Sequence, residues 1–195
     1  MAAEDRLSVL QCGWKGDSDG LLSDKWQECG KTKKKVIGIK KLRLYLETTA
    51  FNYYFDENRA GYESTVKLFE AISAGEYEGY SSVHVMEELK RAQEPKRSNM
   101  LALVEKHRIR ILTNDARIVT LAELYIANGI IPATHRLDSL HIASASVYAL
   151  DCVVSYNFQH INRAKTKILT AHMNREAGYN SVVICTSEEV FDDGL

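Results

Sequence analysis

The chain has 195 residues, of which 45% are hydrophobic, so it is long and apolar enough to bury the core of one domain. No apolar run approaches the roughly 18 to 20 residues of a membrane-spanning helix, and the N-terminal segment lacks the apolar stretch of a secretory signal. We therefore expect a cytoplasmic protein with no membrane anchor. The net charge is −1, but residues 42–195 carry sixteen Lys/Arg against twenty Asp/Glu. This acidic balance argues against a simple nucleic-acid-binding module.

Residues 1–35 lack sustained periodicity and carry scattered glycines and charges, which predicts a flexible or poorly structured N-terminal extension. The segment from Lys25 to Thr32 is close to a phosphate-binding loop. However, Lys25 stands where that loop needs its first glycine, and no buried strand precedes it. We interpret the lysine-rich residues 31–35 as a solvated basic segment. Residues 36–195 are predicted to form the domain.

From Ile37 onward, short apolar runs alternate with helical patterns. The predicted order is strand 43–47, helix 63–73, strand 78–83, helix 83–92, a helix around 100–104, strand 109–112, a helix between 115 and 129, a helix from 138, strand 152–156, helix 165–176 and strand 181–186. Strands separated by helices predict an α/β fold with a parallel sheet covered on both faces. The four cysteines show no CxxC spacing, which argues against a zinc site or a disulfide framework, and Cys152 and Cys185 lie in apolar runs typical of a core.

Parallel sheets of this kind bind ligands beyond the carboxyl ends of their strands, near the point where the strand order reverses. Glu47 ends the first predicted strand, Glu88 lies on the helix after the second, and Asn157 follows strand 152–156. Asp138 begins the helix before that strand. Oxygen ligands without cysteine suit Mg²⁺ or Mn²⁺ better than Zn²⁺. We predict that Glu47, Glu88 and Asp138 converge on such an ion.

Each of these residues also has a purely structural interpretation. Glu47 fits the solvent-facing start of a loop. Glu88 fits the charged outer face of a helix, and because Glu87 lies about 100° away around that helix, only one of the two can face a given site. Asp138 is a common helix cap, and Asn157 suits a turn.

Two histidines lie close to these residues in the sequence. His141 follows Asp138 by one helical turn, and we interpret it as a packed or hydrogen-bonded helix residue rather than a ligand. His160 follows Asn157 closely and is a candidate for a substrate contact.

Several ordered blocks of the sequence resemble PIN-domain proteins. These blocks are LYLETTAFNYYFDENR, YSSVHVMEEL, LDSLHIASA, DCVVSYNFQHIN and GYNSVVICTSEEV, which together span about residues 42–191. The resemblance implies a three-layer α/β/α fold with a central parallel sheet of four to five strands. Many PIN domains are metal-dependent ribonucleases, including toxins of toxin–antitoxin pairs, so the resemblance also implies a metal-dependent endoribonuclease.

By this resemblance, Glu47, Glu88 and Asp138 would hold the metal, Thr48 would support the first acid, and Asn157 would orient water. The implied partners are RNA, an antitoxin protein and a second copy in a homodimer. RNA-backbone contacts would come from the basic residues Lys90, Arg91, Arg163 and Lys165, and solvated helix faces explain these residues equally well.

Two positions depart from the family pattern. The first acid is usually Asp where this chain has Glu47, and the fourth position, often Asp, is Asn157 here. The departures leave open a catalytically weakened PIN-like domain that acts in RNA binding or protein assembly. A nucleotide-binding switch on the same sheet is a third alternative, but the chain lacks GxGxxG and an intact phosphate-binding loop.

Overall fold

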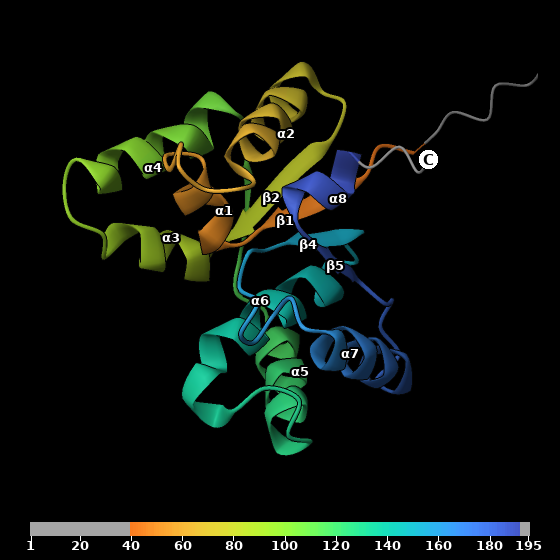
Figure 1. The fold of residues 1–195 in the computed structure, drawn as a ribbon. Helices are drawn as coiled ribbons and strands as arrows, with labels where there is room; N and C mark the ends of the chain where they lie inside the picture. Colours follow the sequence, from red (N-terminus) through yellow and green to blue (C-terminus); the bar gives the residue numbers. More distant parts are fainter. Residues whose placement is uncertain (1–39, 192–195) are drawn as a thin grey trace, which may run out of the picture. The chain divides into compact units, whose positions relative to one another are not determined.

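The computed structural model describes residues 40–191. The predicted N-terminal extension and the partial phosphate-binding loop lie outside these residues. The described part contains one parallel sheet with the order β3-β2-β1-β4-β5 (Figure 1). Its strands are β1 (Arg43–Leu46), β2 (Glu78–Ser82), β3 (Arg110–Leu112), β4 (Cys152–Val154) and β5 (Val183–Cys185).

Helices cover both faces of the sheet, so the fold is a three-layer α/β/α arrangement, as predicted. One side carries α1 (Thr48–Tyr53), α2 (Tyr62–Ala74), α3 (Val83–Lys90), α4 (Lys96–Lys106) and α8 (Ser187–Phe191). The other side carries α5 (Ala116–Ala127), α6 (Arg136–Val147) and α7 (Ala164–Glu176), with a 3₁₀ turn, η1 (Ala133–His135), before α6 (Figure 1).

The strand order reverses between β1 and β4. From β1 the chain moves outward to β2 and β3, then returns across the sheet to β4 and continues to β5. The two central strands pair in parallel with Leu44 opposite Cys152 and Leu46 opposite Val154. Their carboxyl ends therefore form the crevice in which a sheet of this topology binds ligands.

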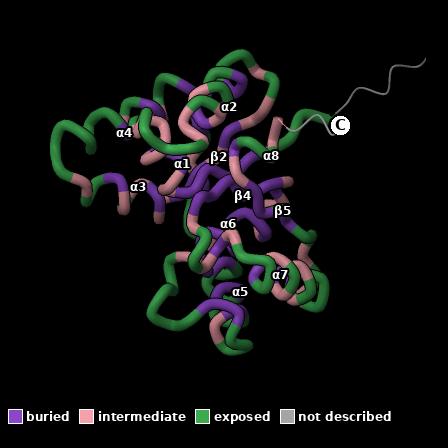
Figure 2. The backbone as a smooth tube through the Cα atoms, in the orientation of Figure 1, coloured by how far each residue is buried: buried purple, intermediate pink, exposed green. Residues whose placement is uncertain are grey.

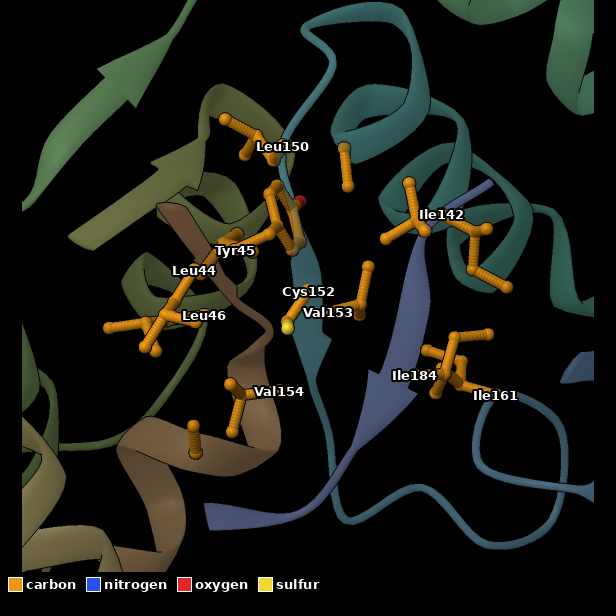
Figure 3. Close-up of a cluster of buried hydrophobic side chains, with 14 of the residues drawn as sticks. Leu44, Tyr45, Leu46, Ile142, Leu150, Cys152, Val153, Val154, Ile161 and Ile184 are labelled. Carbon is orange, nitrogen blue, oxygen red and sulfur yellow. The ribbon is translucent and has the colours of Figure 1, made fainter. Parts of the chain in front are cut away.

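The central strands form the core because their side chains are buried on both faces. Leu44, Tyr45 and Leu46 have no exposed surface, and neither do Val153 and Val154. Successive residues of a strand point to opposite faces of the sheet. In Figure 3, Val153 of β4 points toward Ile142 of α6, whereas Leu44 and Leu46 of β1 point away from that helix.

Helix α6 is unusually buried for a helix in an outer layer, and Figure 2 shows its backbone largely in the buried colour. Its small residues Ala143, Ser144 and Ala145 are completely or almost completely buried and allow close packing on the sheet. The hydroxyls of Ser144 and Ser146 donate to the carbonyls of Leu140 and Ile142, which satisfies them inside the core.

All five predicted strands and the six predicted helices are present. Asp115 caps α5, as one of the two predicted alternatives, and Cys152 and Cys185 are buried free thiols. Helix α6 begins at Arg136, so Asp138 lies within its first turn rather than at its start. The short helices α1 and α8 were not predicted. Among the described residues, none of the helices combines the length and the apolar composition needed to cross a membrane.

Candidate metal centre at the carboxyl ends of the strands

Glu47 follows β1 directly and is buried, with 4% of its surface exposed. Its backbone N–H donates to the carbonyl of Val154 at 3.2 Å, which fixes it between the two central strands. Its Oε2 accepts hydrogen bonds from the backbone N–H of Thr49 at 3.1 Å, from the Thr49 hydroxyl and from Ser155 Oγ at 3.0 Å. Burial raises the pKa of Glu47, opposed by the charge of His141 and by these hydrogen bonds.

Glu88 lies on α3, the helix that follows β2, and its carboxylate lies close to that of Glu47. Thr48 Oγ1 donates to Glu88 Oε2 at 2.5 Å, and His141 Nε2 lies 3.0 Å from the same oxygen. The adjacent Glu87 has a 62% exposed side chain and pairs with Lys90, so Glu88 is the one of the two that faces the site. Thr48 therefore supports Glu88 and not, as predicted, the first acid, Glu47. The hydroxyl groups that donate to Glu47 are those of Thr49 and Ser155.

The pKa of Glu88 reflects opposing influences. Burial acts to raise it, but the hydrogen bond and charge of His141, the hydroxyl of Thr48 and the charge of Arg91 lower it, and the net direction is downward. Glu88 is therefore an anion at neutral pH. Burial disfavours the anionic form of the neighbouring Glu47.

His141 joins Glu47 and Glu88 in a group whose ligand atoms all lie within 4.8 Å of one another. Its ring is fixed by the Tyr45 hydroxyl, 2.9 Å from Nδ1, and that hydroxyl lies 2.7 Å from Ser82 Oγ. Burial acts to lower the pKa of His141, but its bond to Glu88 and the surrounding carboxylates raise it overall. His141 is packed and hydrogen-bonded, as predicted, and it also offers a ligand atom, which the sequence did not reveal.

Asp138 belongs to an adjoining group. Together with His135 and His160 it presents three ligand atoms within 4.8 Å of one another. The two imidazole rings stack with centroids 3.7 Å apart, and His135 Nδ1 lies 3.8 Å from Asp138 Oδ2. Burial raises the pKa of Asp138, opposed by the nearby histidines and by a hydrogen bond from Asn157. The charge of Asp138 also acts on His141, so the two groups are electrostatically connected.

Asn157 lies in the turn after β4, two residues after Ser155. Its Oδ1 accepts from the backbone N–H of His160 at 3.1 Å, and its side chain acts to lower the pKa of Asp138. It therefore acts as a turn residue and as a neighbour of an acid at the same time. The four residues predicted to contact the RNA backbone are all exposed: Lys90, Arg91, Arg163 and Lys165. Of these, Lys90 forms an ion pair with Glu87.

The donors at this site fit a divalent cation. Two carboxylates, those of Glu47 and Asp138, are disfavoured as anions by their burial. Asp138 Oδ2 is a buried atom that lacks a well-formed hydrogen bond. Buried anions and unsatisfied ligand atoms are costly unless a positive charge meets them. The carboxylate oxygens of Glu47, Glu88 and Asp138 suit Mg²⁺ or Mn²⁺.

Comparison with protein-family models and with curated proteins finds no match. Among solved structures, the chain is similar to one in VapBC2 from Rickettsia felis bound to a promoter DNA fragment, with 16% identity and a TM-score of 0.48, over 73% of this chain and 97% of the other. It is also similar to VapC20 of Mycobacterium tuberculosis, a Sarcin-Ricin loop cleaving toxin, with 13% identity and a TM-score of 0.44, over 71% of this chain and 98% of the other. The order of the parallel strands and the helices on both faces of the sheet define the fold of the described residues.

Proposed function

We propose that residues 40–191 form a metal-dependent endoribonuclease of the PIN-like type, with Mg²⁺ or Mn²⁺ as its cofactor. The observation that carries this proposal is the meeting of Glu47, Glu88 and His141, with Asp138 one helical turn away, at the point where the strand order reverses. These residues come from three separate elements of the fold. Burying negative charge there is unfavourable for stability alone, which supports a functional reason for it.

The residues of the chain have distinct roles in this proposal. Glu47, Glu88 and Asp138 would hold the ion, and Thr49 and Ser155 orient the carboxylate of Glu47 through hydrogen bonds. When bound, the divalent ion supplies Lewis acidity, which polarises a phosphoryl oxygen and lowers the pKa of water. It also offsets the acidic charge of the domain where a phosphate must approach.

Cleavage of a labelled single-stranded RNA in the presence of Mn²⁺ tests the proposal. We expect the wild type to cleave, and EDTA or Asp138→Asn to abolish cleavage. Glu88→Gln and Glu87→Gln form a matched pair on consecutive positions of α3. The first should lose activity by at least about 100-fold, the scale on which aligned catalytic groups act, and the second should keep it. Cleavage that survives EDTA and Glu88→Gln would contradict the site assignment.

A non-catalytic PIN-like domain that binds RNA or a protein is the alternative, and two observations favour it. His141 already supplies a positive partner to Glu88, at 3.0 Å, and the fourth position carries the uncharged Asn157. If the domain only binds RNA, the labelled RNA would bind the protein and would remain uncleaved with Mn²⁺ present.

Because the chain's sequence blocks resemble those of PIN-domain proteins, which include toxins, we also propose an antitoxin protein as a partner. Expression of the wild type in a bacterial host should arrest growth, and Glu88→Gln should relieve the arrest while Glu87→Gln does not. Unimpaired growth with the soluble wild type and active nuclease would argue against a toxin role.

A further inference from the structure

A cavity of about 510 Å³ is bounded by the turn after β4, the same turn that supports Glu47 through Ser155. Its walls come from the end of α1, the loop before α2, the turn after β4 and the start of α8, and include Tyr53, Arg59, Tyr156, Phe158, Thr186 and Glu188. The volume is within the range of about 300–1,000 Å³ that small-molecule sites occupy. The roles given to Glu47, Glu88 and Asp138 do not use this cavity.

The walls are dominated by flat, π-rich groups. The rings of Tyr53 and Tyr156 stack almost parallel, with centroids 3.7 Å apart and 7° between their planes. The guanidinium of Arg59 lies over the Tyr53 ring at 4.8 Å. The Phe158 ring meets Tyr156 edge to face at 6.4 Å and is 57% exposed, although burial in the core would stabilise a side chain of this kind.

The cavity is not basic, because the guanidinium of Arg59 pairs with Asp56 at 2.6 Å. Arg59 supplies a positive charge, and Glu188 supplies a negative one that accepts a hydrogen bond from the Tyr156 hydroxyl at 2.8 Å. A phosphate would be repelled by Glu188. A neutral aromatic ring with hydrogen-bond donors on its edge would be attracted by the rings, the guanidinium plane and the carboxylate together.

The cavity is joined directly to Glu47. The backbone N–H of Tyr156 donates to Thr49 Oγ1 at 2.8 Å, and that hydroxyl donates to Glu47 Oε2. Ser155, the residue before Tyr156, also donates to Glu47. The wall of the cavity and the support of the acid are thus consecutive residues of one turn, so a nucleotide bound here would contact the turn that supports Glu47.

We propose that this cavity binds a nucleobase of a single-stranded RNA substrate, on the exposed ring of Phe158 and the Arg59–Tyr53–Tyr156 stack. This inference rests on the proposed nuclease function and adds a base-recognition site to it. Bases stack on aromatic side chains and on guanidinium planes when RNA is unpaired, because only then are their faces free. The nucleotide bound in the cavity would therefore be unpaired.

Titration of the full chain with adenosine and with ribose 5-phosphate tests this site without any divalent metal. Adenosine carries a base and no phosphate, and ribose 5-phosphate carries the reverse. Aromatic ¹H–¹³C NMR spectra should show adenosine shifting the signals of Phe158 and Tyr53, while ribose 5-phosphate leaves them unchanged. Phe158→Ala should weaken adenosine binding about tenfold, which is the scale of one base–aromatic stack.

Phe55→Ala is the matched control, since Phe55 is also an exposed phenylalanine, at 39%, and lies outside the cavity walls. It should bind adenosine as the wild type does. Arg59→Ala is a second variant at an exposed position and should also weaken binding. Equal binding of adenosine by the Phe55 and Phe158 variants, equal binding of the two ligands, or no shift at millimolar adenosine would overturn the proposal.

The RNA cleavage assay on the same preparations separates this inference from the proposed function. Cleavage without adenosine binding removes the base site and leaves the nuclease. Adenosine binding without cleavage leaves the base site and removes the nuclease.

Discussion

Glu47 shows how a single residue can be well hydrogen-bonded and still unfavourable as an anion. Three donors from Thr49 and Ser155 converge on one of its oxygens, yet burial outweighs them and raises its pKa. A raised pKa means that the folded state favours the protonated acid. Glu47 therefore stabilises the fold below its unfolded pKa of about 4, and this contribution is lost as the pH rises through its higher folded pKa.

Replacing Glu47 by Gln should remove this pH dependence. In EDTA at pH 7, we expect Glu47→Gln to be more stable than the wild type, because a neutral amide avoids the cost of burying the anion. At pH 4 the two proteins should unfold at similar urea concentrations, since the wild-type acid is then protonated. Urea unfolding between these pH values measures the difference. A wild type that is the more stable protein at pH 7 in EDTA would contradict the explanation.

Thr49 connects the acid to the turn after β4, and its hydroxyl both donates to Glu47 and accepts from the backbone of Tyr156. Thr49→Ala leaves that buried backbone N–H without its partner and should cost about 2 kcal/mol of stability. Thr49→Ser keeps the hydroxyl and should cost much less. Chemical denaturation distinguishes them, and equal losses in the two variants would indicate that the methyl group, not the hydroxyl, is responsible.

At the scale of elements, the sequence predicted the long helices and strands and missed α1, the short helix whose Thr48 and Thr49 donate hydrogen bonds to Glu88 and Glu47. Helix α1 has six residues and begins immediately after Glu47, which caps it by accepting from the N–H of Thr49. So short a helix has no periodicity to recognise, and its two threonines are poor helix formers. It forms because the buried Ala50 and Phe51 pack against the core, which is a tertiary effect.

The same limitation explains His141. One turn after Asp138, a histidine on a buried helix looks the same in sequence whether it packs in the core or faces carboxylates. Its partners Glu47 and Glu88 lie more than 50 positions away in the chain. The pattern of strands predicted the edge of the sheet where they would meet, but the assignment of ligand atoms depended on side-chain geometry that no local pattern encodes.

The connection between α1 and α2 depends on Gly61, which has a φ of +94°. A Cβ there would lie 2.5 Å from Glu188 Oε1 and 2.8 Å from the Tyr156 hydroxyl. Gly129 also has a positive φ, +64°, but a Cβ there meets nothing within 4 Å. Gly129→Ala should therefore cost about 1 kcal/mol from backbone strain alone, and Gly61→Ala about 3 kcal/mol from strain and overlap. Equal free energies of unfolding for the two variants would show that the overlap is relieved at no cost.

At the scale of the whole molecule, the parallel sheet and its strand-order reversal were accessible from sequence because alternating strands and helices leave few ways to connect them. The division of the acids into two adjoining groups was not accessible. Glu47 and Glu88 lie with His141, and Asp138 lies with His135 and His160.

The stability of the whole domain in Mn²⁺ reports which group holds the ion, because an ion that binds only the folded state raises the melting temperature. At about 100 times the dissociation constant, the gain is about 2.7 kcal/mol, or about 5 to 10 °C for a domain of this size. We expect this shift for the wild type and for the double variant His135→Ala/His160→Ala, but not for Glu88→Gln. Glu87→Gln controls for the loss of a surface charge and should behave as the wild type. If the double histidine variant loses the shift and Glu88→Gln keeps it, the ion belongs to the group of Asp138, and catalysis at Glu47 would have to be abandoned.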